Sequence, residues 1–298
     1  MTDVEVPMDI RLRLIHGTLQ RLADRVGADV LHIKGPAVAP PLLDTRVHVD
    51  PATGAPLVET VHRFSTDADL LIRPVHVARF LAEATRNGWV RKTSFTSGSA
   101  FGHAVNLYHP RLGNADLHRR FPGLRDDAFD DLWRDRGSIR LGHVDCPTPS
   151  LTAQRLLLLL HAARSGRHHP DTRRAWSLAT EDEREEVRRL ARHFDAEIGV
   201  AAALDDLDRF RDHPDYLLWR YFRDGDPSRL NEWRARWRSA TTLRGKLVVV
   251  RSLLFFDHSL LEAELGRRPT RRDVARRLGT RWARLLREAS THILRRAS

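Results

Sequence analysis

The sequence predicts an α+β fold, in which a mixed first half precedes an all-helical second half. In the first half, short runs rich in β-branched and other apolar residues alternate with segments of helical periodicity. From residue 152 onward, apolar residues recur almost throughout at the spacing of amphipathic helices. Pro147 and Pro149 interrupt the pattern between the two halves. We therefore expect one domain over residues 1–148 and a second, helical domain over residues 149–298.

The first domain is expected to begin with a helix, and strands and helices then alternate along the chain. The expected helices cover residues 10–25 and 75–87, and the expected strands cover residues 29–33, 47–50, 57–61, 67–72, 89–93, 104–108 and 114–118. Pro36 fits the first turn of a further helix, where its missing N–H costs nothing. In the second domain, helices are expected at residues 153–164, 182–194, 198–210, 216–222, 230–237, 243–265, 270–278 and 280–295.

Composition excludes several classes of protein. The 298 residues contain a single cysteine, Cys146, which excludes an intramolecular disulfide and a cysteine-rich zinc cluster. No apolar run approaches the roughly 18–20 residues that a membrane span needs, and the N-terminus lacks the layout of a signal peptide. We therefore expect a cytoplasmic protein with no membrane contact.

Positive charge is concentrated in the second half. Residues 1–150 contain 19 Lys and Arg against 18 Asp and Glu, whereas residues 151–298 contain 31 against 21, a net charge of +10. A basic half beside a neutral half indicates a polyanionic partner, with nucleic acid the first candidate. Solvated helix faces are the alternative interpretation.

Two aspartates open the most apolar strand of the first domain. Residues 67–72 read Asp-Ala-Asp-Leu-Leu-Ile. Because side chains alternate along a strand, Asp67 and Asp69 point the same way, about 6.5–7 Å apart along the backbone. Like charges at the start of a buried strand repel each other unless a cation lies between them, and carboxylate oxygens suit Mg²⁺. A strand-end turn or helix cap is the alternative, and the apolar residues that follow favour the metal.

Asp116 is the candidate for a third carboxylate. It lies in the expected strand at residues 114–118, and Leu117 faces the opposite way. Three such carboxylates could hold two metal ions for phosphoryl or nucleotidyl transfer. His118 shares the face of Asp116, where it would either contact an acceptor or pair with a carboxylate.

A glycine follows the first expected strand, in the sequence Lys34-Gly35-Pro36. A helix N-terminus at this point would bring backbone N–H groups close to a phosphate, Gly35 would leave room for it, and Lys34 could neutralise its charge. An ordinary strand–helix turn is the alternative interpretation.

The order of these motifs resembles one family. It comprises Lys34-Gly35, then Arg63, then Asp67-x-Asp69 with its apolar run, then Asp116-Leu117-His118, then an apolar helix that ends at His161. Over residues 28–180 the sequence resembles the uncharacterised bacterial nucleotidyltransferase family of the DNA polymerase β superfamily. The resemblance implies a polymerase β-like core, a small mixed sheet with flanking helices, followed by a helical C-terminal part. It also implies Mg²⁺-dependent transfer of a nucleoside monophosphate from an NTP to a hydroxyl, with release of pyrophosphate.

The resemblance also assigns residues. Asp67, Asp69 and Asp116 would be catalytic and would bind two Mg²⁺ ions, and Asp116 would help to activate the acceptor hydroxyl. Contacts to the nucleotide are assigned to Lys34, Gly35, Arg63 and Ser65. Pro36 departs from the serine or second glycine usual in the superfamily, so no hydroxyl there can bind phosphate. Residues 44–62 are longer than expected and form either a surface hairpin or a flap over the nucleotide.

The acceptor is left open. The basic second half favours RNA, such as tRNA, and a protein side chain or a small molecule are the alternatives. Toxin–antitoxin systems use this chemistry, so a toxin with an antitoxin or another protein partner is a further expectation. The competing class is an inactive module of the same fold that binds nucleic acid through its basic helices.

Residues 266–279 resemble the helix-turn-helix segments of transcription regulators. Thr270 would cap the helix with Asp273 three residues on, and the segment is either a solvated basic helix or a grip on an RNA backbone. Three tryptophans are spaced for helix packing, with base stacking as the alternative: Trp219, Trp233 and Trp237.

Residues around the end of the apolar helix have simpler expectations. His161 would be a core or capping histidine, or else a substrate contact. His168 and His169 lie in a loop without nearby cysteines, so zinc is not expected. Asp171 is expected to be the N-cap of the next helix.

Overall fold

The computed structural model describes residues 6–51, 53–61, 63, 65–95, 103–254, 261, 265, 267–280, 283 and 287. The chain divides into two compact units. The first unit comprises Met1–Leu160 and Pro170–Glu197, and the second comprises His161–His169 and Ile198–Ser298. The domain boundary expected after residue 148 stays a prediction, and the first unit contains residues on both sides of it.

A five-stranded mixed sheet organises the first unit. Its strands lie in the order β1 (Val30–His32), β4 (Asp67–Ile72), β7 (Gly113–His118), β6 (Ala104–His109) and β5 (Val90–Arg91). Strands β4 and β7 are parallel, and the other neighbours are antiparallel. The structure therefore confirms an α+β fold with a small mixed sheet.

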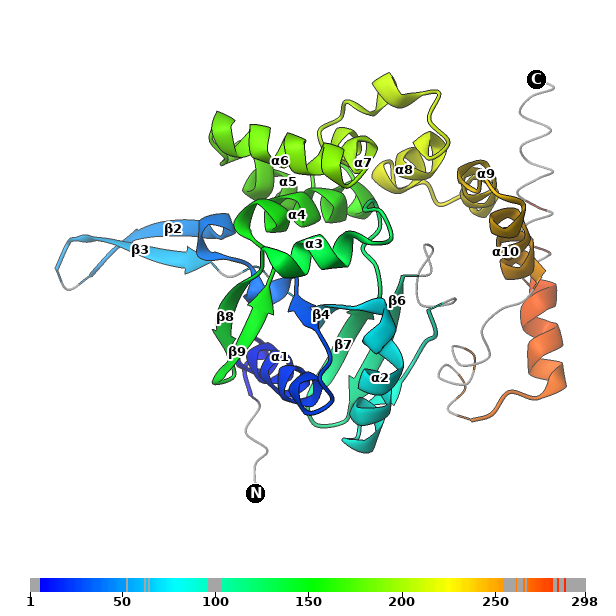
Figure 1. The fold of residues 1–298 in the computed structure, drawn as a ribbon, viewed down its shortest axis with the longest axis horizontal. Helices are drawn as coiled ribbons and strands as arrows, with labels where there is room; N and C mark the ends of the chain where they lie inside the picture. Colours follow the sequence, from blue (N-terminus) through cyan, green and yellow to red (C-terminus); the bar gives the residue numbers. More distant parts are fainter. Residues whose placement is uncertain are drawn as a thin grey trace. The chain divides into compact units, whose positions relative to one another are not determined.

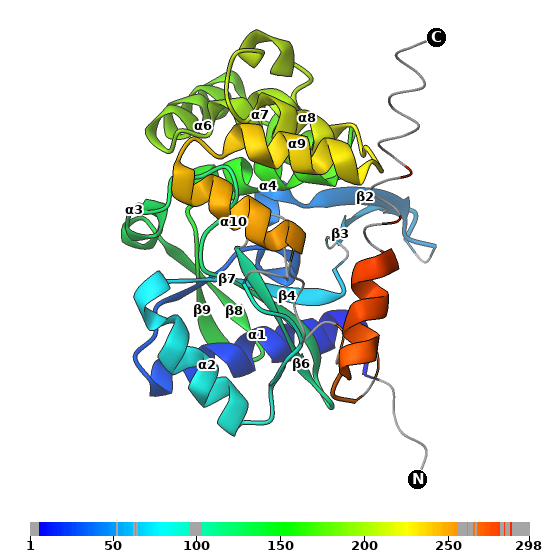
Figure 2. The ribbon, with the colours of Figure 1, turned by 90° about the vertical axis from the view of Figure 1, so that its right-hand side faces the viewer.

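Alternation along β4 separates the two faces of this sheet. Ala68, Leu70 and Ile72 lie in the hydrophobic core with residues of α1 (Met8–Arg25) and α2 (Val77–Arg86). Both helices cover the same face of the sheet (Figures 1 and 2). Because successive side chains point to opposite faces, the aspartates of β4 lie on the other face.

The helix expected to begin at Pro36 is absent, and that prediction was wrong. The described chain there has two 3₁₀ turns instead, η1 (Gly35–Ala37) and η2 (Pro40–Leu42). Pro40 and Pro41 lack the N–H groups that would continue an α-helix, which accounts for the difference. The helix expected at residues 75–87 begins with a third such turn, η3 (Pro74–His76), before α2.

Residues 44–61 form a two-stranded hairpin. β2 (Asp44–Val49) pairs antiparallel with β3 (Pro56–Val61), and the ribbon projects from the first unit (Figure 1). The side chains of Val47 and Val49 are 64% and 66% exposed, so the ribbon has no core of its own. The two strands expected between residues 47 and 61 are therefore confirmed, with longer bounds.

The first unit also contains elements that the sequence analysis missed. These are α3 (Ala128–Arg134) and a second two-stranded sheet of β8 (Gly137–Leu141) and β9 (Val144–Thr148). Leu141 and Cys146 are buried in a small cluster with Ala37. The unit is completed by α4 (Leu151–Ser165, up to Leu160), α5 (Pro170–Thr172), a π-helical turn η4 (Arg173–Ser177) and α6 (Glu181–His193).

The described part of the second unit is mainly helical, as expected. It contains α7 (Glu197–Ala203), η5 (Leu207–Phe210), α8 (Tyr216–Arg223), α9 (Arg229–Ser239), α10 (Leu243–Leu254) and a helix at residues 271–280. The prediction of a single helix at residues 198–210 was wrong, because Asp205 has φ +59° and separates α7 from the 3₁₀ turn η5. Asp273 N donates to Thr270 Oγ1 at 3.3 Å and Thr270 N donates to Asp273 Oδ2 at 2.9 Å, so the expected cap is confirmed. The remaining parts of the helices expected at residues 243–265 and 280–295 lie largely outside the described residues. None of the helices in the described chain is both long and apolar enough to span a bilayer.

Candidate metal centre and active site

Two aspartates from separate stretches of sequence meet on adjacent strands. Asp69 of β4 is in register with Asp116 of β7, and the two strands are parallel. Ligand atoms of Asp69, Asp116 and His118 all lie within 4.8 Å of one another. Asp67 lies two residues before Asp69 and in register with Asn114, on the same sheet face. The structure therefore brings the three carboxylates to one face of one strand pair, and the group of ligand atoms within 4.8 Å of one another contains Asp69 and Asp116 but not Asp67.

The three carboxylates differ in exposure. Asp69 is 2% exposed, whereas Asp67 and Asp116 are half-buried. Ser65 precedes β4, and its Oγ donates to Asp67 Oδ1 at 3.2 Å and to the Asp67 carbonyl at 2.8 Å. One deep carboxylate is thus flanked by two that solvent can reach.

Two side chains contact the deep carboxylate directly. Lys34 Nζ lies 2.6 Å from Asp69 Oδ1, and His118 Nε2 lies 2.9 Å from the same oxygen. The His118 ring also stacks on His103, with 5.1 Å between ring centroids. Of the two roles left open for His118, the structure therefore shows pairing with a carboxylate.

Repulsion among the carboxylates is visible in their pKa values. Burial, followed by the charges of Asp69 and Asp67, raises the pKa of Asp116 to about 7. Burial and the charge of Asp69 also raise the pKa of Asp67. Burial alone would raise the pKa of Asp69 too, but Lys34 and the hydrogen bond from His118 outweigh it and lower that pKa well below its ordinary value.

The donor set fits a hard divalent cation. Within the described chain, Lys34 and His118 are the only basic side chains that form ion pairs with these carboxylates, and both contact Asp69. The carboxylates therefore carry more negative charge than the neighbouring lysine balances, and a proton on Asp116 relieves part of the excess. Carboxylate oxygens with room for water and phosphate oxygens are what Mg²⁺ requires.

Asn106 is a site residue that the sequence analysis missed. It lies in register with Asp116 on β6, and its Nδ2 donates to Asp116 Oδ1. Thr93 Oγ1 donates to Asn106 Oδ1 at 2.8 Å and accepts from Asn106 N at 2.9 Å. The available signal was an asparagine inside an otherwise apolar strand, since such an amide needs partners when it is buried.

The Lys34-Gly35 turn packs against the start of β4. Gly35 has φ +59°, which glycine adopts without strain, and a Cβ there would lie 3.3 Å from Ser65 Cβ. The close approach keeps this turn beside Ser65 and Asp67.

Arg63 is held by a buried acid. Its Nε lies 3.0 Å from Asp171 Oδ1 and its Nη2 lies 3.0 Å from Asp171 Oδ2, a bidentate pair. Asp171 is fully buried and also accepts from Arg174 Nη1 at 3.0 Å. The expectation that Asp171 is an N-cap was wrong, because it lies inside α5 and binds two arginines. Arg63 is close enough to Asp67 for its charge to lower the pKa of that carboxyl.

A buried histidine pair lies between α1 and β1. His16 Nδ1 and His32 Nδ1 are 2.7 Å apart, and His32 Nε2 lies 2.9 Å from Gln20 Oε1. Since the Gln20 amide nitrogen donates to Asp24, its oxygen accepts from His32, and His32 Nδ1 then accepts from His16. Burial lowers the pKa of His16 to about 4 and that of His32 well below its ordinary value, so both rings are neutral.

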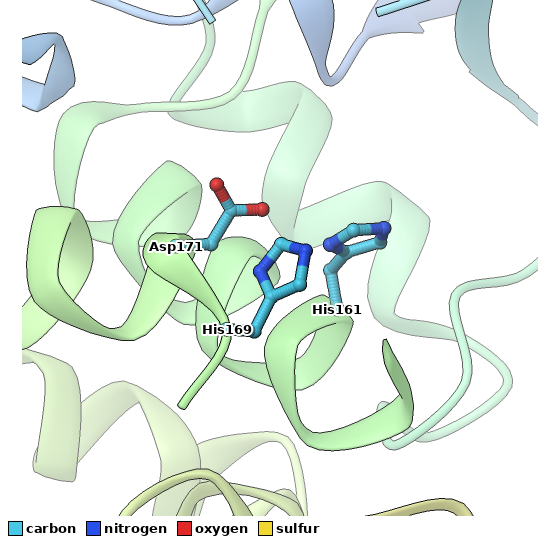
Figure 3. A group of neighbouring side chains, drawn as sticks. All are labelled: His161, His169 and Asp171. Carbon is cyan, nitrogen blue, oxygen red and sulfur yellow. The ribbon is translucent and has the colours of Figure 1, made fainter. Parts of the chain in front are cut away.

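His161 lies at the end of α4. Its half-buried ring packs edge-on against His169, with 5.0 Å between centroids (Figure 3). The ring is therefore not in the core, and a capping role and a contact with substrate both stay predictions.

No protein-family model and no curated protein matches this chain.

Proposed function

We propose that this chain is a Mg²⁺-dependent nucleotidyltransferase with a polymerase β-like core, which moves a nucleoside monophosphate from an NTP to an acceptor hydroxyl. The observation that carries the proposal is the register of Asp69 with Asp116 on parallel neighbours, with Asp67 on the same face. Three carboxylates with Lys34, Arg63 and His118 as their basic neighbours favour divalent cations over an ordinary surface cluster.

Asp67, Asp69 and Asp116 are the residues that would hold two Mg²⁺ ions. Bound ions would supply charge for the triphosphate and for the attacking and leaving oxygens. Lys34 and Arg63 would add positive charge for the phosphates, and these two with Gly35 and Ser65 form the expected nucleotide contacts. Ser65 and Asp171 would then orient Asp67 and Arg63 respectively.

The reaction forms a bond between the acceptor oxygen and the α-phosphorus. The bond from that phosphorus to the oxygen bridging to the β-phosphate breaks, and pyrophosphate leaves with the electron pair. The hydroxyl proton would go to the carboxylate of Asp116, which lies in register with Asp69 on the neighbouring strand. Asn106 would hold the Asp116 carboxylate in place during this transfer.

RNA is the acceptor that we favour. The second half of the sequence carries 31 Lys and Arg against 21 Asp and Glu, and such an excess attracts a polyanion. A toxin that modifies tRNA and is controlled by an antitoxin would be one biological setting for this activity.

Transfer of label from each α-labelled NTP, with Mg²⁺, to total RNA and to lysate protein tests the proposal. We expect label on RNA, and Asp67→Asn should abolish it. Asp145→Asn, the same chemical change at an exposed aspartate, is the matched control and should keep full activity. Label on protein or on a small molecule would support a nucleotidyltransferase but contradict RNA as the acceptor. No transfer with any NTP would contradict the enzyme and leave a nucleic-acid-binding module as the alternative.

A further inference from the structure

A basic cavity lies in the second unit. Its volume is about 400 Å³, and it is lined by Leu217, Arg234, Trp237, Arg238 and Lys246. Leu217 comes from α8, Lys246 from α10, and the other three from α9. Among the described residues that line it, none is acidic.

Helix α9 presents two different faces. Arg234, Trp237 and Arg238 are spaced three and four residues apart, which places them on one helix face. All three are exposed, whereas Glu232 and Trp233 on the other side are buried. The cavity is therefore built on the solvent-facing side of a helix that is anchored by its opposite side.

The arginines of α9 divide in the same way. Arg229 and Arg236 pair with the buried Glu232, at 2.6 Å and 2.5 Å. Arg234 and Arg238 form no ion pair with any carboxylate in the described part of the chain. With Lys246 they give the cavity three positive charges that no acidic residue in the described part of the chain pairs with.

Trp237 differs from the other tryptophans expected to pack between helices. Trp219 and Trp233 are 3% and 9% exposed, which confirms the packing expectation for both. Trp237 is 46% exposed, so it packs beside a neighbouring helix and still presents part of its ring to solvent. Lys246 Nζ lies 5.2 Å from the Trp237 ring centroid, and the indole thus forms the aromatic wall of a cationic cavity.

We propose that this cavity binds one nucleotide of single-stranded RNA, with the base stacked on Trp237 and the flanking phosphates held by Arg234, Arg238 and Lys246. The cavity is shallow and largely open to solvent, which leaves room for a base to lie against the Trp237 ring. Aromatic stacking with cationic backbone contacts is how proteins hold single strands without reading sequence. The inference rests on the proposed function in one respect, because it takes the bound strand to be the RNA acceptor. RNA binding itself can be measured without catalysis.

The test uses the full chain and a fluorescein-labelled U-rich RNA 20-mer, without NTP or Mg²⁺. Binding is followed by fluorescence anisotropy at several salt concentrations. Trp237→Ala should weaken binding about 5- to 100-fold, and Trp237→Phe by only about threefold, since a base keeps an aromatic face to stack on. Trp133→Ala, which removes a partly exposed tryptophan beside Arg136 in the first unit, is the matched control and should bind as wild type.

Charge is tested separately. The double variant Arg234→Ala/Arg238→Ala should weaken RNA binding. It should also reduce the slope of log affinity against log salt concentration by about 1.4, because each lost phosphate contact lowers the slope by about 0.7. Arg209→Ala with Arg211→Ala removes two arginines from the same unit that pair with Asp206 and Asp208, and should change the slope little. Circular dichroism and thermal melting would confirm that each variant is folded.

Unchanged RNA affinity in folded Trp237→Ala would overturn the proposal. Equal loss in the two double-arginine variants would also overturn it, because binding would then follow net charge alone. Asp67→Asn should bind RNA as wild type does. If no label is transferred but RNA binding depends on Trp237, the proposed enzymatic function is wrong and the RNA-binding cavity is supported. If label is transferred but RNA binding does not depend on Trp237, the enzymatic function is supported and the RNA-binding cavity is wrong.

Discussion

Replacing Asp116 by asparagine should stabilise the metal-free protein above neutral pH. Burial and the charges of Asp69 and Asp67 raise the pKa of Asp116 from 3.8 to about 7. The asparagine carries no charge, has nearly the same shape, and its oxygen can still accept the hydrogen bond from Asn106.

The magnitude follows from linkage between protonation and folding. Between pH 3.8 and about 7 the folded state holds a proton on Asp116 that the unfolded chain has released. The contribution of Asp116 to folding stability therefore falls as pH rises through this window and is constant above it. About three pH units at about 1.36 kcal/mol each give roughly 4 kcal/mol as the upper limit of the gain in Asp116→Asn.

Urea denaturation in EDTA, from pH 4 to 8.5, measures this gain directly. The difference in unfolding free energy between Asp116→Asn and wild type should be near zero at pH 4 and reach roughly 2–4 kcal/mol at pH 8. Asp145→Asn should show no such trend, because Asp145 is exposed. Mg²⁺ should reduce the difference, since a bound ion stabilises only the charged carboxylate. Equal stability of wild type and Asp116→Asn at pH 8 would refute the reasoning.

Three further predictions concern the buried histidine pair, Asn106 and the buried carboxylate of Asp171. Because burial lowers the pKa of His16 to about 4, this residue should contribute a loss of roughly 3 kcal/mol in folding stability as pH drops from 6.5 to 4. Urea melts of His16→Gln should lack this contribution and keep the one from His32. Asn106→Ala should lower the transfer rate about 10- to 100-fold while RNA affinity stays unchanged, since it removes the group that orients Asp116. Asp171→Asn should cost about 3–5 kcal/mol in thermal or urea melts because it leaves two arginines without their buried partner. Asp206→Asn, which breaks the exposed ion pair with Arg209, is the control and should lower the free energy of unfolding by less than about 1 kcal/mol.

The three carboxylates of the site could be predicted from the sequence because their positions depend on the alternation of side chains along single strands. Alternation along residues 67–72 fixes which side chains share a face, and the observed strand β4 has these bounds. Asp116 was found in the same way, since its strand shows the same alternation. Local sequence patterns therefore predicted the carboxylates of β4 and of β7, although they could not predict how the two strands are paired.

The residues that orient this cluster could not be predicted from local patterns. Asn106 reaches Asp116 through strand register, and Asp171 reaches Arg63 across 108 positions of sequence. Contacts of this kind depend on tertiary packing, and helix-cap statistics gave the wrong role for Asp171.

Proline accounts for two of the differences in the fold. The helix expected from Pro36 is limited to 3₁₀ turns because Pro40 and Pro41 follow it. Pro147 was interpreted as a boundary, yet it lies within β9, a strand paired on one side only, where a missing N–H is tolerated.

In the proposed enzyme, Asp67, Asp69 and Asp116 together bind divalent cations beside a triphosphate. Titration of the full chain with Mn²⁺, followed by electron paramagnetic resonance with a non-hydrolysable NTP present, tests it most directly. We predict two bound ions per chain, and loss of this binding in Asp69→Asn but not in Asp145→Asn. Mn²⁺ that stays free in the wild type, or binds Asp69→Asn equally well, would contradict the claim.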